Sequence, residues 1–86
     1  MEKQIERIER LHKLIRLKAT GTPKECAQKL EISQRQLYRL LGFMKGLGAP
    51  VYYEVYYGAY CYEYEVEWSF GFTKRTKVIK NKKYDN

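Results

Sequence analysis

Hydrophobic residues in the first part of the chain recur at intervals of three and four, the spacing that places side chains on one face of a helix. Between residues 2 and 18, charged side chains fill the gaps between them. The apolar positions are Ile5, Ile8, Leu11, Leu14, Ile15 and Leu17. This pattern predicts an amphipathic first helix. We interpret it as core scaffold and not as a coiled-coil seam, because it holds fewer than three heptads. A brief extended bridge is expected around Gly21 and Pro23.

Two helix-start signals follow. Thr22 can cap a helix whose first residue is Pro23, and Glu25 completes a capping box. Ser33 and Gln36 have the spacing of a second capping box. The apolar positions of the first of these helices are Cys26, Ala27 and Leu30. Two short capped helices with about three residues between them are typical of a helix-turn-helix.

The third helix is predicted from about residue 34 to residue 45 or 47. Its inward face holds Leu37, Leu40, Leu41 and Met44, at spacings of three and four. The opposite face holds Gln34, Arg35, Tyr38, Arg39 and Lys45, with Gln36 near its edge. The segment 46–50, "GLGAP", ends the helix because Pro50 cannot continue it.

Strict alternation replaces the helical spacing after residue 50. The segment 51–55, "VYYEV", predicts a strand with Val51, Tyr53 and Val55 on one face, and a turn follows around Gly58. The return strand is predicted over residues 60–72, "YCYEYEVEWSFGF", with aromatic side chains covering the helices and glutamates facing away. Thirteen residues would span ~43 Å, more than the first strand can pair. We therefore expect the half from Val66 to Phe72 to need another neighbour and to support self-association.

Charge divides the chain into three blocks. Residues 1–49 carry +6, residues 50–73 carry −4 with no Lys or Arg, and residues 74–86 carry +5, which sum to the net charge of +7. Basic blocks of this density favour a polyanionic partner. We predict an α+β domain over residues 1–73, with three helices followed by a long β-hairpin. A basic, flexible tail is predicted over residues 74–86.

The order of these elements is that of a winged helix-turn-helix. Residues 5–62 resemble the N-terminal DNA-binding domain of bacterial regulators related to the deoxyribonucleoside-operon repressor, the biotin-operon repressor and proteins with a WYL domain. The resemblance is carried by "TPKECAQKLEISQRQLYRLL" at 22–41 and "LGAPVYY" at 47–53. It implies a small bacterial transcriptional regulator that binds double-stranded DNA with the third helix, residues 34–46, in the major groove. The residues carried over are Ser33 as the cap near the DNA backbone, Gln34, Arg35 and Gln36 at the helix start, and Tyr38 and Arg39 as the Tyr-Arg pair.

The physical chemistry of the same residues agrees with that implication. The N-terminal part of a recognition helix lies nearest to base edges, where Arg can bond guanine and Gln can bond adenine. Arg35 is therefore our first candidate for a base contact. Arg39, Lys45 and Lys24 are better placed for phosphates. Tyr38 is either a contact or a packing residue at the rim of the core.

The predicted wing of this chain departs from the family pattern. Wings in the family tend to carry Arg or Lys, whereas the predicted wing here carries neither. Phosphates would repel its glutamate face. The tyrosine hydroxyls at its tip, Tyr56 and Tyr57, can still donate to a phosphate. We expect the missing cations to come from the tail, which can follow the backbone or enter a minor groove. They are Lys74, Arg75, Lys77, Lys80, Lys82 and Lys83.

A protein-interaction or assembly module is the alternative function, including an architectural or recombination accessory role on DNA. Eleven of the thirteen aromatic residues follow residue 50, and Tyr and Trp are typical interface anchors. A homodimer through strand 60–72 is compatible with either function.

The sequence does not favour catalysis or a cofactor. It contains no nucleophile with a matching base and no glycine-rich phosphate loop, so we predict that the protein is not an enzyme. Cys26 and Cys61 lack metal-site spacing and are expected to be reduced thiols, while His12, the single histidine, is expected at the surface or its boundary. No metal, cofactor or small-molecule effector is predicted. Without a long apolar run or a leader pattern, we expect a soluble, cytoplasmic protein with no membrane contact.

Overall fold

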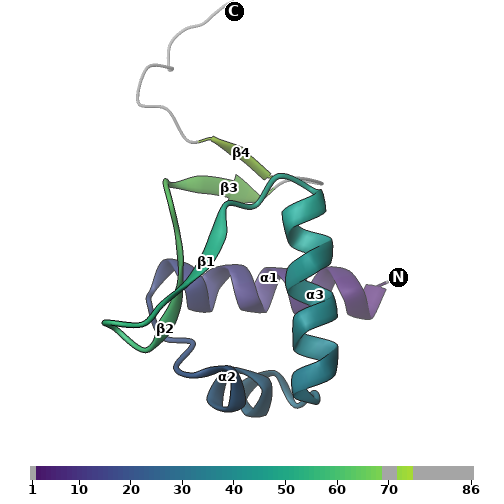
Figure 1. Ribbon diagram of the computed structural model, residues 1–86. Coiled ribbons are helices and arrows are strands. Elements are labelled where there is room, and N and C mark those ends of the chain that lie inside the picture. The colour runs from purple at the N-terminus through teal and green to yellow at the C-terminus, as the bar shows by residue number, and fades with distance from the viewer. Residues whose placement is uncertain (1, 69–71, 75–86) are drawn as a thin grey trace, which may run out of the picture.

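The computed structural model describes residues 2–68 and 72–74 of the chain. Three helices are followed by four short strands, which makes the chain α+β, as predicted. Their bounds are α1 Glu2–Arg16, α2 Pro23–Leu30, α3 Gln34–Gly46, β1 Val51–Glu54, β2 Ala59–Tyr62, β3 Val66–Trp68 and β4 Phe72–Lys74. In Figure 1, α3 crosses α1, α2 lies near the N-terminal end of α3, and the antiparallel β1–β2 hairpin lies beside α3.

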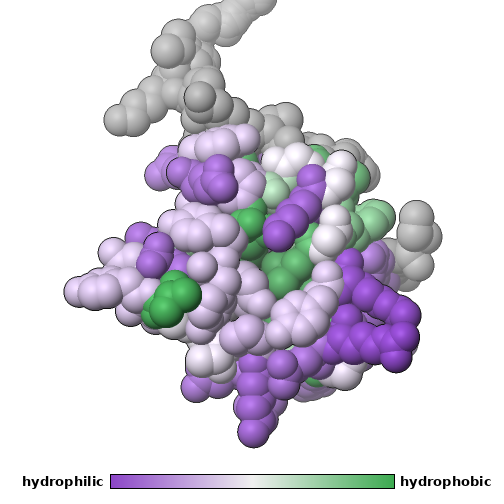
Figure 2. Space-filling model, in the orientation of Figure 1, coloured by the Kyte–Doolittle hydropathy of each residue, from purple (hydrophilic) through white to green (hydrophobic). Residues whose placement is uncertain are grey.

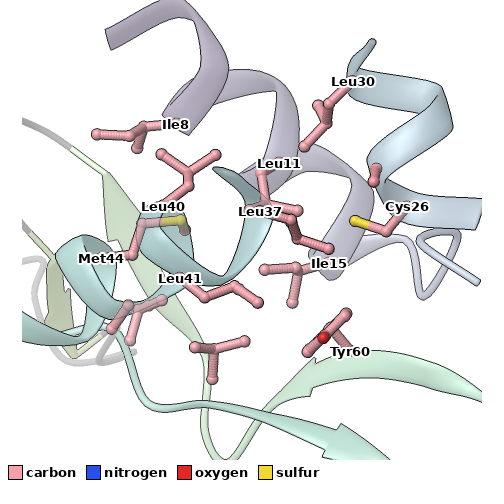
Figure 3. Packing of buried hydrophobic residues seen from close by; sticks show 14 residues of the cluster. Ile8, Leu11, Ile15, Cys26, Leu30, Leu37, Leu40, Leu41, Met44 and Tyr60 are labelled. Atoms are coloured by element: carbon pink, nitrogen blue, oxygen red, sulfur yellow. The ribbon is translucent and has the colours of Figure 1, made fainter. Parts of the chain in front are cut away.

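One hydrophobic core joins the helices to the strands (Figure 3). Each helix contributes the side chains that its periodicity predicts, and Tyr60 reaches the same cluster from β2. The fully buried members are Ile8, Leu11, Ile15, Cys26, Leu37 and Met44. Two apolar positions of the first segment were misassigned, because Ile5 is 38% exposed and Leu17, which lies beyond the end of α1, is 66% exposed. The periodicity is therefore reliable within the helix and not at its ends.

The β1–β2 hairpin pairs Val51 with Tyr62 at its base and Glu54 with Ala59 next to its turn. Gly58 adopts a left-handed φ of 65° in that turn, and its N–H donates to the carbonyl of Glu54 at 2.8 Å. The prediction that Val55 continues the strand face of Val51 and Tyr53 is wrong, because β1 ends one residue earlier and Val55 is 81% exposed.

The predicted single strand over residues 60–72 is also wrong. Pairing with β1 stops after Tyr62, and the Glu63 N–H donates to the carbonyl of Pro50 at 2.9 Å. Residues 63 and 64 form a bend, and β3 then pairs antiparallel with β4, with Val66 opposite Lys74 and Trp68 opposite Phe72. The interruption has a physical cause: β1 offers only four residues to pair, and a proline precedes it.

The second hairpin removes the basis on which self-association was predicted. The neighbour of Val66–Trp68 is β4 of the same chain, so the homodimer stays a prediction without that support. Strand β4 runs one residue past the domain boundary predicted at 73/74, since it includes Lys74. The rest of the predicted tail, residues 75–86, lies outside the described residues.

The predicted division between an aromatic and an acidic face holds along β2 and β3, with two exceptions. Tyr60 and Val66 are buried and Trp68 packs against the core, whereas Glu63, Glu65 and Glu67 are exposed. The exceptions are Tyr64, which is 46% exposed, and Cys61, which is buried although it shares the parity of the glutamates. Both cysteines are free buried thiols, as predicted, and burial raises the pKa of Cys26 to about 11.

The segment between α1 and α2 anchors the hairpin. It is not a strand, but Thr20 is fully buried and its hydroxyl accepts a hydrogen bond from the Tyr60 N–H at 2.8 Å. A second link joins His12 Nδ1 to the Tyr62 hydroxyl at 2.9 Å, which places His12 at the core boundary. Burial raises the pKa of Tyr62, so this hydroxyl stays protonated at neutral pH. None of the described helices is long and apolar enough to cross a membrane.

Candidate functional site

Both predicted capping boxes are present at the starts of α2 and α3. At α2, the Glu25 N–H donates to the Thr22 hydroxyl at 3.2 Å and the Glu25 carboxylate accepts from the Thr22 N–H at 2.9 Å. At α3, Ser33 and Gln36 make the same two bonds at 3.0 and 2.9 Å. The Thr22 backbone N–H and hydroxyl lower the pKa of Glu25, which keeps its charge at the helix N-terminus. Each helix start is therefore fixed by its own first turn.

A three-residue turn joins α2 to α3. Glu31 ends α2 in a left-handed conformation, with φ at 59°, and its N–H donates to the carbonyls of Ala27 and Gln28. The Ile32 N–H donates to the Ala27 carbonyl at 3.0 Å, and Ile32 packs against the core. These bonds satisfy the last carbonyls of α2 and hold the start of α3 in a defined direction.

The outward face of α3 is basic. All six side chains predicted for it are exposed, namely Gln34, Arg35, Gln36, Tyr38, Arg39 and Lys45. The helix contains no Asp or Glu, and no ion pair joins Arg35, Arg39 or Lys45 to a carboxylate in the described part of the chain. Strongly hydrophilic surface, purple in Figure 2, gathers beside the N-terminal half of α3. Three cations on one helix without local compensation form an anion-attracting surface.

In the first turn of α3, some of the residues predicted to contact DNA are engaged in the helix cap and others are not. The Gln36 carbonyl oxygen is occupied by the cap, so only its amino group remains to donate. The Ser33 hydroxyl accepts from the Gln36 N–H within the same cap. Gln34 and Arg35 make no polar contact with the described residues, which leaves their side chains available to a ligand.

A groove of about 370 Å³ separates the outward face of α3 from the β1–β2 hairpin. It appears as the hydrophobic, green area between hydrophilic flanks in Figure 2. Its lining residues are Tyr38, Leu41, Gly42, Lys45, Val51, Tyr52, Tyr53 and Tyr60. Tyr38 therefore belongs both to the rim of the groove and to the outward face, and it is 52% exposed. This flank of α3 offers hydroxyls and one ammonium group.

Tyr60 forms the floor of that groove. Its ring meets the Tyr53 ring edge-on at a centroid distance of 5.1 Å. Burial, and to a smaller extent the neighbouring Tyr38 and Cys26, raise the pKa of Tyr60 to about 12. Its hydroxyl is therefore neutral at physiological pH and can act as a hydrogen-bond donor.

The tip of the β1–β2 hairpin is exposed and aromatic. Tyr56 is 87% exposed and Tyr57 is 61% exposed, and their rings meet edge-on at 5.3 Å. The ammonium of Lys18 lies 5.5 Å from the centre of the Tyr57 ring. Sequence reasoning missed this cation because it comes from the segment that follows α1, far from the hairpin in the chain. The tip of the β1–β2 hairpin contains no basic residue, but Lys18 supplies a positive charge beside it.

The remaining predicted cations differ in their placement. Lys24 is exposed in the first turn of α2. Lys74 lies in β4, of which the structure describes the backbone pairing, whereas Arg75 and Lys77 lie outside the described residues. Two other cations have structural partners: Arg10 donates to the Lys29 carbonyl at 2.7 Å, and the Lys29 ammonium donates to the Ala19 carbonyl.

Residues 2–68 and 72–74 contain no group of three His, Cys, Asp or Glu side chains that could hold a metal ion. The comparisons with known proteins identify no relative: no protein-family model, no curated protein and no solved structure matches this chain.

Proposed function

We propose that this protein is a winged helix-turn-helix that binds double-stranded DNA, with α3 in the major groove, and that it acts as a small transcriptional regulator. The observation that carries the proposal is the capped α2–turn–α3 pair, whose second helix exposes three cations and no carboxylate. Thirteen residues give α3 a length of about 20 Å. A helix of about 10–12 Å diameter fits the major groove of B-DNA, which is about 12 Å wide.

Each side chain of α3 has a proposed role. Arg35 and Gln34, in the first turn, are nearest to base edges, and a guanidinium can bond guanine bidentately. Arg39 and Lys45 lie further along the helix and contact phosphates. Tyr38 donates from the edge of the tyrosine-lined groove. The N-terminus of α2, with Lys24 beside it, meets the backbone at the edge of the site.

The proposal is tested by fluorescence anisotropy of a labelled random duplex at low salt. Wild-type protein should bind, and the double variant Arg35→Glu/Arg39→Glu should lose ~100-fold or more in affinity, since two contacts of about 1–3 kcal/mol each are replaced by repulsion. The matched control is Lys3→Glu/Lys13→Glu, which reverses two exposed lysines on α1 and should cost much less. No binding by wild-type protein would refute the proposal, and equal losses in both variants would place the surface elsewhere.

A protein-interaction module is the second candidate, and the exposed hairpin tip favours it. Val55, Tyr56 and Tyr57 are all more than half exposed, although Tyr is a typical anchor of protein interfaces. If wild-type protein fails to bind duplex DNA, Tyr56→Ser/Tyr57→Ser becomes the informative variant. Sedimentation of this variant against wild-type protein would then show whether the tip mediates assembly.

A further inference from the structure

A cleft of about 240 Å³ lies between α1 and α3, on the flank of α3 opposite the tyrosine-lined groove. Its lining residues are Gln4, Arg7, Ile32, Gln36, Arg39 and Leu40. Helix α1 supplies the first two residues, α3 supplies the last three, and Ile32 comes from the turn that precedes α3. Two arginines and two glutamines therefore line one cleft together with the apolar residues Ile32 and Leu40.

The charge in this cleft is not compensated. None of the described residues that line it carries a carboxylate, and no ion pair joins Arg7 or Arg39 to a carboxylate in the described part of the chain. The cap orients Gln36, because its carbonyl oxygen accepts from the Ser33 N–H at 2.9 Å and its amino group remains free to donate. Two like charges that share one cleft favour an anion with several acceptor oxygens.

The position of the cleft identifies a source for that anion. If α3 fills a major groove, the two sugar-phosphate backbones must pass along its two flanks, because the groove is scarcely wider than the helix. One flank of α3 faces the hairpin with tyrosines and Lys45, and the other faces α1 with Arg7 and Arg39. The two flanks of α3 therefore offer different side chains to the two DNA backbones.

We infer that the α1–α3 cleft binds one backbone phosphodiester of duplex DNA, and that Arg7 of α1 and Arg39 both contact this phosphodiester. This inference rests on the proposed function and adds to it a contact from α1, which sequence reasoning treats as scaffold. Arg7 is half-buried and lines the cleft, and an arginine can pack its apolar stem against the protein while its charged head group remains accessible. A planar guanidinium can bond two phosphate oxygens at once.

The test is the salt dependence of random-duplex affinity for Arg7→Gln. Each phosphate contact contributes about 0.9 to the slope of log K against log salt concentration, so the slope should become less steep by about that amount. Affinity at low salt should fall several-fold. Arg7→Lys keeps the charge and should keep the slope. Lys13→Gln, which removes one exposed charge from α1 outside the cleft, should leave the slope at its wild-type value.

Two results would overturn the inference while leaving the proposed function intact. One is a wild-type slope for Arg7→Gln in a protein whose binding still depends on Arg35 and Arg39. The other is an equal change of slope for Lys13→Gln, which would indicate a general effect of net charge. Failure of wild-type protein to bind any duplex would instead refute the proposed function.

A second measurement distinguishes duplex DNA from free phosphate. The side-chain Nε–H resonance of Arg7 should shift on addition of one equivalent of duplex. It should not shift at the same concentration of inorganic phosphate. Saturation of that shift by inorganic phosphate at comparable concentration would contradict the assignment of the cleft to a DNA backbone.

Discussion

The helical half of the molecule, residues 2–46, and the strand half, residues 51–74, are held in place by different kinds of interaction. In the helical half, the caps of α2 and α3 join residues three apart and are exposed. In the strand half, the anchoring bonds from Thr20 and His12 reach across 40 and 50 residues of chain and are at least partly buried. A two-stranded hairpin is marginal in water by itself, so the strands depend on the helices for their position.

The two halves also differ in the charge that they expose. The outward face of α3 carries three cations and no carboxylate, whereas Glu63 and Glu65, between β2 and β3, and Glu67, in β3, are exposed. A polyanion attracted to one half is repelled by the acidic face of the other. Under the proposed function, this separation of charge would orient an approaching duplex before any specific contact forms.

The largest expected effect tests whether the helical half dominates stability. Leu37 of α3 is fully buried and Val66 of β3 is 3% exposed. Leu37→Ala should lower the free energy of unfolding by about 2–5 kcal/mol. Val66→Ala removes two carbon atoms and should cost less, about 1–2 kcal/mol. Urea unfolding measures both, with an unchanged m-value as the control for two-state behaviour. Equal losses would contradict the difference between the halves.

The same contrast explains what sequence could predict. The starts of α2 and α3 were predicted correctly because Thr22 and Ser33 act on residues within one helical turn. The β1–β2 hairpin was also predicted, but the continuous strand over residues 60–72 was wrong, because alternation has the same period whether a strand is continuous or interrupted. Nothing local indicates that residues 72–74 supply the partner of β3, since Phe72 continues the alternation that predicts one long strand and Lys74 begins the predicted basic tail.

In the candidate site, too, features set by local sequence were predicted and features set by tertiary packing were not. The exposed residues of α3 were predicted from helical spacing, which is a local property. The contributions of Lys18 to the hairpin tip and of Arg7 to the α1–α3 cleft were not predicted, because each depends on how α1 packs against elements distant in the sequence. Basic residues on an amphipathic helix are common, and spacing alone cannot distinguish those that border a site.

A medium effect is expected where the two halves are joined. Thr20→Val keeps the shape of the side chain but leaves the Tyr60 N–H without its acceptor in a buried position. The expected cost is about 1–3 kcal/mol in the free energy of unfolding. Hydrogen exchange should show faster exchange of the Tyr60 amide, while the amides of α3 change only with global stability. Thr20→Ser retains the hydroxyl and should keep the Tyr60 amide protected. A protected Tyr60 amide in Thr20→Val would show that the bond does not anchor the hairpin.

The smallest expected effect concerns Gly42, an exposed residue inside α3. A Cβ added there meets no atom within 4 Å, so packing within the described chain gives no reason for a glycine. Gly42→Ala should raise the free energy of unfolding by up to about 1 kcal/mol, because alanine is the better helix former.

Binding should respond to Gly42→Ala in the opposite direction if α3 lies close against a duplex. Gly42 borders the tyrosine-lined groove, where a methyl group would separate the helix from the DNA backbone. We expect a several-fold loss of duplex affinity in a protein that unfolds at a higher temperature, measured by anisotropy and thermal denaturation. Gly46→Ala, one turn nearer the end of α3, also meets no atom within 4 Å and should affect binding less, since it does not line the groove. A gain in stability with unchanged affinity would mean that the glycine face of α3 does not touch DNA. The proposed contrast between a DNA-binding helical half and an acidic strand half would then have to rest on the side chains of α3 alone.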